Sequence, residues 1–151
     1  EVLQISVGSF LLDDMLFSRA ASWLSQITIG RGDLSKSMHL EVNAPAVMRL
    51  TQEIIEKAKG WKLQTSVGGG LSMDTIGPMA AMLEAGRFNT RHMVFHNSEG
   101  FRADAAAHLA AGLRWEQSMY HALAGKVPAK RASYQARIRV LDERLAGKGV
   151  V

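Results

Sequence analysis

Asp33 is the residue whose type and position most clearly suit chemistry. It follows the β-branched run Ile27-Thr28-Ile29, after Gly30, Arg31 and Gly32. A β-branched run that leads through glycine into polar residues predicts a strand and the turn at its end. In barrels of parallel strands the turns after the strands form the reacting face, so a carboxylate there is a candidate contact for a metal or a substrate. We therefore predict that Asp33 binds a ligand, with Gly30, Arg31 and Gly32 beside it on the substrate side.

Three consecutive glycines, Gly68, Gly69 and Gly70, follow a second apolar run and form another candidate site. Because glycine has no Cβ, such a turn lets the backbone approach a phosphate or a carboxylate. Met73 stands where the dinucleotide-binding fingerprint requires its last glycine, so the spacing is not that of a dinucleotide loop. A tight turn without a ligand is the alternative interpretation.

Histidines supply the remaining candidates. His39 lies in the loop expected after Asp33, and it is the histidine for which we predict a catalytic role. His92 and His96 share one face of a strand by a period of two, which would also suit a metal pair. No third ligand lies nearby in the sequence, so we expect both to line the core or the barrel. Arg91 is expected to be structural and to pair with carboxylates beneath the barrel.

An alternation of strand-like and helix-like segments positions these residues. Strands are predicted near residues 2–7, 26–30, 62–67 and 91–96. Helical periodicity is found over residues 10–24, 43–60, 72–86, 103–124 and 130–146. Successive βα units favour right-handed crossovers and a parallel sheet, so the predicted fold class is α/β. Residues 1–100 would form four βα units, and residues 101–151 a C-terminal helical extension that packs on them or on a partner subunit.

Four βα units are half of a (β/α)₈ barrel, which typically needs about 250 residues. A free half-barrel leaves unpaired strand edges, and such edges invite association. We therefore expect a homo-oligomer or a second chain that completes the barrel, unless the other half belongs to the same gene product; an open sheet that stands alone is less favoured. Because the last two helices carry apolar stripes beyond what a half-barrel needs, residues 103–146 are expected to contribute to the contact.

The composition excludes several classes of protein. A hydrophobic fraction of 47% and a charged fraction of 21% are ordinary for a globular domain. The absence of Cys excludes disulfides and thiolate chemistry and fits a reducing compartment, so we predict a cytoplasmic location. No segment approaches the roughly 18 apolar residues of a membrane span. The first residue is Glu1 rather than Met, which leaves open a fragment or a processed product.

The net charge of +4 comes from the C-terminal segment. Residues 126–151 hold seven basic and two acidic residues, whereas the preceding residues sum to −1. No aromatic residues interleave with these basic ones in the manner of a nucleic-acid site. We interpret the basic segment as a solvated or subunit-contacting helix face and expect no nucleic-acid partner.

Several separated segments carry a resemblance to a known family. The segments are Ile29-Gly30-Arg31-Gly32-Asp33-Leu34-Ser35-Lys36-Ser37, Val67-Gly68-Gly69-Gly70-Leu71-Ser72, Phe88-Asn89-Thr90-Arg91-His92-Met93-Val94-Phe95 and, more loosely, 112–116 and 137–144. Their order and spacing resemble the aldolase/citrate lyase superfamily of metal-dependent TIM barrels. The first segment looks like that family's Asp-Leu-Ser segment after strand six, and the second is similar to its glycine turn after strand seven. The resemblance covers nearly the whole chain, but only the C-terminal half of the family's domain.

The resemblance implies a metal-dependent carbon–carbon lyase that acts on a 2-oxo acid or an acyl-CoA enolate, or the C-terminal half of such an enzyme. It implies Mg²⁺ or Mn²⁺ bound by Asp33 and by a Glu after strand five, because hard cations prefer oxygen ligands and stabilise a developing enolate oxyanion. The matching segment, Gln4-Ile5-Ser6-Val7-Gly8, contains no carboxylate, and the family's catalytic Arg would precede Glu1.

Two other functions stay open at this point. One is a non-catalytic scaffold or assembly subunit that has lost the metal site. The other is an open α/β module that binds a phosphorylated ligand at Gly68–Gly70.

Overall fold

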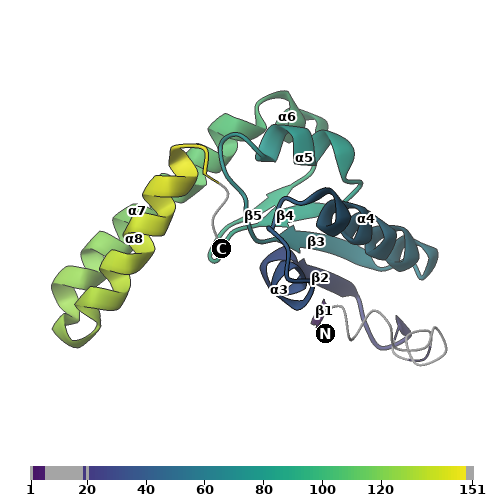
Figure 1. Cartoon of the computed structure of the whole chain (residues 1–151), viewed down its shortest axis with the longest axis horizontal. Helices are drawn as coiled ribbons and strands as arrows, with labels where there is room; N and C mark the ends of the chain where they lie inside the picture. The colour runs from purple at the N-terminus through teal and green to yellow at the C-terminus, as the bar shows by residue number, and fades with distance from the viewer. Residues whose placement is uncertain (1, 6–18, 20, 149–151) are drawn as a thin grey trace.

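A mostly parallel β-sheet organises the chain in the computed structural model, which describes residues 2–5, 19 and 21–148 (Figure 1). Within these residues the sheet has the order β1-β2-β3-β4-β5. The strands are β1 (Val2–Ile5), β2 (Gln26–Gly30), β3 (Gln64–Gly68), β4 (Arg87–Asn89) and β5 (Val94–His96). β1 to β4 pair in parallel, and β5 pairs antiparallel to β4. The predicted α/β class and the parallel pairing of the first three strands are confirmed.

The strands β2 and β3 are buried against the helices. In β2, Ile27 and Ile29 are fully buried and alternate with half-exposed residues, whereas β3 is buried from Thr65 to Gly68. A strand that is buried on both faces is typical of a parallel sheet covered by helices. Parallel register brings Gly30 opposite Gly68, so the carboxyl ends of β2 and β3 lie at one edge of the sheet.

The helix predicted over 43–60 is α4 (Pro45–Gly60). Its buried stripe consists of Val47, Thr51, Ile54, Ile55 and Ala58. Pro45 occupies the first turn, where the missing backbone N–H costs nothing. A proline at the start and an apolar stripe with helical spacing made this helix predictable. The helix predicted over 10–24 falls largely outside the described residues.

The fourth strand was placed wrongly. The parallel strand is β4 (Arg87–Asn89), and the predicted strand at 91–96 is instead a turn followed by antiparallel β5. The backbone N–H of Thr90 donates to the carbonyl of Met93 at 3.0 Å, and the N–H of Met93 donates to Thr90 Oγ1 at 3.1 Å. These bonds close the turn and reverse the chain. β5 therefore occupies the edge of β4 that a further parallel strand would need.

Two further segments differ from the prediction. The loop expected over 31–43 begins with a short helix, α3 (Arg31–Ser37). The helix expected over 72–86 is shorter, α5 (Ile76–Met82), because Thr75 Oγ1 holds the loop before it: it accepts from the N–H of Ser72 at 3.0 Å and also contacts the Ser72 hydroxyl.

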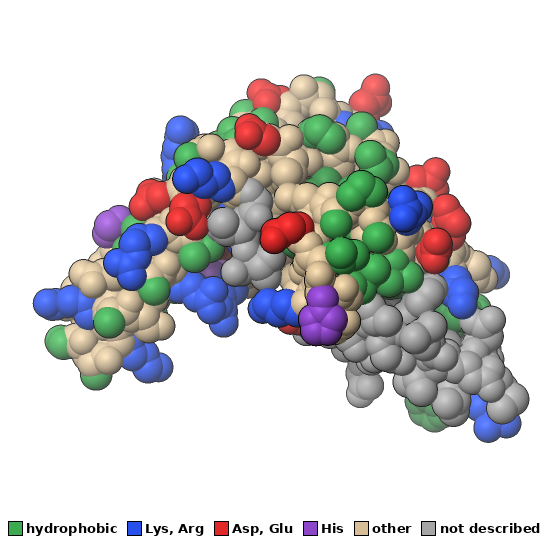
Figure 2. Space-filling model, in the orientation of Figure 1, with side chains coloured by type: hydrophobic (Ala, Val, Ile, Leu, Met, Phe, Trp, Pro, Cys, Tyr) green, Lys and Arg blue, Asp and Glu red, His purple; other side chains and the backbone are tan. Residues whose placement is uncertain are grey.

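The C-terminal part is a helical hairpin that projects away from the sheet (Figure 1). After α6 (Glu99–Ala103) come α7 (Ala105–Lys126), the 3₁₀ turn η1 (Pro128–Lys130) and α8 (Arg131–Leu145). The predicted apolar stripes are covered by each other and by the core: Leu109, Leu113, Tyr120, Ile138 and Leu141 are all buried. These stripes therefore no longer argue for a partner subunit. Lys and Arg side chains gather over the hairpin in Figure 2.

No helix in the described part of the chain combines the length and the apolar character that crossing a bilayer requires.

Candidate functional site

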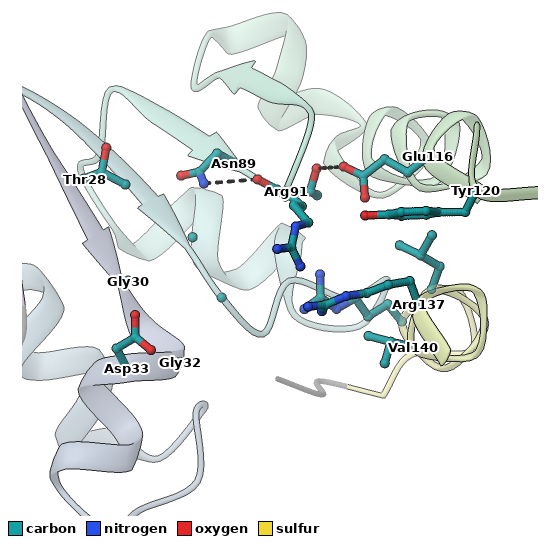
Figure 3. Close-up of a pocket in the computed structure, with 15 residues that line it drawn as sticks. Thr28, Gly30, Gly32, Asp33, Asn89, Arg91, Glu116, Tyr120, Arg137 and Val140 are labelled. Carbon is teal, nitrogen blue, oxygen red and sulfur yellow. Dashed lines mark hydrogen bonds between the residues drawn. The ribbon is translucent and has the colours of Figure 1, made fainter. Parts of the chain in front are cut away.

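A cavity of about 360 Å³ lies at the carboxyl ends of β2, β3 and β4, between the sheet and the α7–α8 hairpin (Figure 3). Ligands of open parallel sheets usually bind outside the carboxyl ends of the strands. The sheet side is lined by Thr28, Gly30, Gly32, Asp33, Gly68, Gly69 and Asn89. Thr90 and Arg91 line it from the β4–β5 turn, and Glu116, Tyr120, Arg137, Val140, Leu141 and Arg144 from the hairpin.

The glycines on the sheet side allow a close approach of neighbouring segments. Gly69 has a φ of +90°, and a Cβ on it would lie 2.6 Å from the backbone nitrogen of Gly32. A Cβ on Gly68 would lie 2.7 Å from Asn89 Nδ2. Two hydrogen bonds fix the Asn89 side chain: Oδ1 accepts from Ser66 Oγ at 2.8 Å, and Nδ2 donates to the Thr90 carbonyl at 3.2 Å. Both predicted turns therefore lie close together and form the tightly packed, polar sheet side of the cavity.

Asp33 lies in the first turn of α3, and its side chain is exposed at the cavity. In Figure 3 it stands across the cavity from Arg91 and Arg137. The structure thus brings five of the predicted site residues into one lining: Gly30, Gly32, Asp33, Gly68 and Gly69.

Arg31 and Gly70, predicted on the substrate side, serve packing instead. The Arg31 side chain is fully buried, and its guanidinium donates to the carbonyls of Gly69 (3.1 Å) and Val42 (2.6 Å) and to Asn43 Oδ1 (2.5 Å). Burial lowers the pKa of Arg31 to about 10. Gly70 faces Val42, whose Cγ1 would be 2.7 Å from an added Cβ. Arg31 therefore ties the glycine turn to the segment after α3.

The histidines lie elsewhere than predicted. His39 is exposed, has a φ of +53° and is not among the residues that line the cavity. His92 and His96 are also exposed, so of the two predicted positions, core or barrel lining, the core is wrong. His92 lies in the β4–β5 turn and His96 in the edge strand β5. His92 Nε2 is hydrogen-bonded to the Tyr120 hydroxyl at 2.9 Å. Arg91 lies at the carboxyl edge rather than beneath the sheet.

Glu116 is the buried carboxylate of the site, with 1% of its surface exposed. It accepts hydrogen bonds from Thr90 Oγ1 and from the backbone N–H of His92, the latter at 2.9 Å. It also interacts with Arg144, whose pKa is lowered by burial, raised by the charge of Glu116 and lowered by the charge of Arg137. Glu116 therefore fastens α7 to the β4–β5 turn and places α8 beside it.

A metal site is not complete within the described residues. They contain no group of three or more His, Asp or Glu side chains that could hold an ion. The carboxylates among the described residues that line the cavity are Asp33 and Glu116, and Glu116 is engaged by Thr90 and His92. A divalent cation would therefore need further ligands besides Asp33.

The helical side of the cavity was missed by sequence reasoning. Arg137 and Arg144 are seven residues apart, which places them on one face of α8. This spacing could have predicted a basic face of the helix from the sequence. Tyr120 and Glu116 lay in the predicted apolar stripe or beside it and gave no separate signal.

Fold and cavity together define an α/β protein with a ligand-sized cavity at the carboxyl edge of a mostly parallel sheet. Comparisons with protein-family models, with curated proteins and with solved structures found no match to this chain.

Proposed function

We propose that this chain is a metal-dependent carbon–carbon lyase of the aldolase/citrate lyase type, or the C-terminal half of one, acting on a 2-oxo acid or an acyl-CoA enolate. The observation that carries the proposal is that the segments resembling the family's two turns line one cavity, with Asp33 on its wall. The cavity lies at the carboxyl ends of parallel strands, where enzymes of barrel folds perform their chemistry.

The proposal includes a half-barrel formed by β1 to β4, and β5 limits how such a barrel could close. Because β5 pairs with β4, closure on that edge would require β5 to leave. A partner would therefore pair more readily at β1, the other end of the sheet order.

A non-catalytic scaffold or assembly subunit is the second candidate, and one observation favours it. Glu116, the other carboxylate that lines the cavity, is buried and accepts hydrogen bonds from Thr90 and His92, so it is not available to a cation. A chain that lost the first metal ligand would keep this cavity and lose turnover.

Titration with Mn²⁺ tests whether Asp33 is placed to bind a metal, as the lyase requires. One carboxylate with waters binds a divalent cation weakly, so the unmodified chain should hold Mn²⁺ poorly. Introducing Ser6→Glu or Val7→Glu after β1 should tighten binding, and Asp33→Asn should abolish the gain. Binding is measured by calorimetry and by the electron paramagnetic resonance of free Mn²⁺, with and without pyruvate as the simplest 2-oxo acid.

Glu41→Gln is the control, because Glu41 is exposed and is not among the cavity residues. If Ser6→Glu, Val7→Glu and Asp33→Asn all leave Mn²⁺ binding unchanged, Asp33 is a turn residue and the scaffold function is supported.

A further inference from the structure

Three arginines line the cavity, two from α8 and one from the β4–β5 turn, and the proposed lyase reaction assigns no role to them. Arg137 and Arg144 lie two turns apart on one face of α8, and Arg91 comes from the β4–β5 turn. In Figure 3 the side chains of Arg91 and Arg137 extend from these separate elements toward the same part of the cavity. We call Arg91, Arg137 and Arg144 the arginine wall.

Among the described residues that line the cavity, the three guanidinium groups of the arginine wall outnumber the two carboxylates, Glu116 and Asp33. Glu116 is shared between Arg144, Thr90 and the His92 backbone, and Asp33 lies on the opposite side of the cavity. For Arg91 and Arg137 the described residues provide no ion pair with a carboxylate. Guanidinium groups that share a small space repel one another. Burial is the main reason that the pKa of Arg144 is lowered; the charge of Glu116 raises this pKa, and the charge of Arg137 lowers it further. A bound anion would offset this repulsion.

The arrangement suits one compact dianion better than a carboxylate. A phosphate group carries close to two charges near neutral pH and presents three acceptor oxygens, so several guanidinium groups can bind it together. A single carboxylate has one charge and two oxygens in a plane, which a single arginine can satisfy. The cavity of about 360 Å³ lies at the small end of ligand sites and admits a phosphate with a few attached atoms.

We propose that the arginine wall binds the phosphate group of a phosphorylated small molecule, next to the glycine turn at Gly68 and Gly69. This binding goes beyond the proposed lyase reaction, since it needs neither a metal nor Asp33. The phosphate could belong to a compact phosphate monoester or to the coenzyme A part of a thioester. The two sources share their chemistry and differ in size.

The first experiment measures binding to the whole chain by calorimetry in EDTA, which removes metals from the result. Glycerol 3-phosphate is the probe, sulfate the matched anion and succinate the dicarboxylate. Because the second pKa of a phosphate monoester is about 6, its affinity should rise about tenfold from pH 5 to pH 7. Sulfate keeps two charges over this range, and its affinity should stay nearly constant.

The titratable groups that face the arginine wall are Asp33, Glu116 and Tyr120 with its partner His92. Their protonation acts on both anions, so the ratio of phosphate to sulfate affinity isolates the proton of the ligand. Arginine stays protonated throughout.

The second experiment uses matched variants. Arg137→Gln should weaken glycerol 3-phosphate binding by about ten- to a hundredfold, the usual worth of a hydrogen bond to a charged group. Arg139→Gln removes the same charge from the same helix at an exposed residue that does not line the cavity, and it should change binding less than about twofold. Arg91→Gln repeats the test from the β4–β5 turn, should Arg137→Gln perturb the hairpin.

Tighter binding of coenzyme A than of glycerol 3-phosphate would support the thioester source, and the reverse would support the compact monoester. Three results would overturn the proposal: no phosphate binding at millimolar concentration, equal effects of Arg137→Gln and Arg139→Gln, or succinate binding that is tighter than phosphate binding and does not depend on pH. Failure of the Mn²⁺ titration would leave this result unchanged, because EDTA is present.

Discussion

Replacing Arg31 by lysine should destabilise the fold by about 3 kcal/mol, although the positive charge is kept. The Arg31 side chain is fully buried. Nη1 donates to the Gly69 carbonyl at 3.1 Å and contacts Met79 Sδ at 2.8 Å. Nη2 donates to the Val42 carbonyl at 2.6 Å and to Asn43 Oδ1 at 2.5 Å. The single nitrogen of lysine cannot occupy the positions of both Nη atoms.

The magnitude follows from the acceptors that would lose their donor. At least one pair of partners, on Nη1 or on Nη2, would be lost. Each pair includes one buried partner, Met79 Sδ or the Val42 carbonyl, and a buried acceptor left unsatisfied costs about 1–3 kcal/mol. An ammonium group is also more strongly hydrated than a guanidinium, so its burial is no easier. In a chain of this size a loss of about 3 kcal/mol lowers Tm by about 6–12 °C.

The contribution of Arg31 to the stability of the unmodified chain should be nearly independent of pH between about 6 and 9. Burial holds the pKa of Arg31 at about 10, below its ordinary value, so the folded protein binds this proton less tightly than the unfolded chain does. The cost of burying the charge is therefore fully present below about pH 10, and stability would rise with pH only above that value.

Urea unfolding followed by circular dichroism measures the change, with Arg49→Lys as the control. Arg49 is an exposed residue of α4, and its substitution should alter stability by less than about 0.5 kcal/mol. If Arg31→Lys were as stable as Arg49→Lys, the idea that one lysine nitrogen cannot replace both Nη atoms would be refuted. If Arg31→Lys instead kept its stability and lost phosphate binding, Arg31 would belong to the ligand site.

Two other predictions concern packing and assembly. Gly112→Ala should lower the free energy of unfolding by about 1–3 kcal/mol, as measured with urea, because the new Cβ would lie 2.6 Å from Phe95 Cζ. Gly125→Ala is the control on the same helix. No atom lies within 4 Å of its added Cβ, so this change should stabilise the fold by about 0.5 kcal/mol. Equal effects would contradict the close packing of α7 on β5. Light scattering should give a mass above 16.5 kDa, because the β1 edge invites pairing; a stable monomer would count against a completed barrel.

The elements that the sequence predicted well are those whose local pattern agrees with their packing. β2 has the β-branched run of Ile27 to Ile29, and the two isoleucines are fully buried. α4 has a proline at its start and an apolar stripe that faces the sheet. In both β2 and α4, the spacing of the apolar residues along the sequence indicates which face of the element is buried in the core.

The region from 87 to 96 was mispredicted because its strands are too short to carry a period. β4 contains a single buried residue, Phe88, whereas the more visible apolar run, Met93-Val94-Phe95, belongs partly to the edge strand β5. Val94 is 59% exposed there. The pairing of these strands is set by the turn bonds of Thr90, which no pattern of hydrophobic residues encodes.

The arginines show why the two sides of the cavity differ in predictability. Arg31 stands within the predicted motif, yet its guanidinium is drawn into the interior by acceptors on two segments that fold beside it, Val42-Asn43 and Gly69. Arg137 is far from the motif in sequence and reaches the cavity because α8 packs on α7. The position of α7 is fixed in turn by Glu116, through its bonds to Thr90 and the His92 backbone. The helical side of the cavity is therefore a product of how the hairpin docks on the sheet, and the same docking brings together the arginines that the ligand would require.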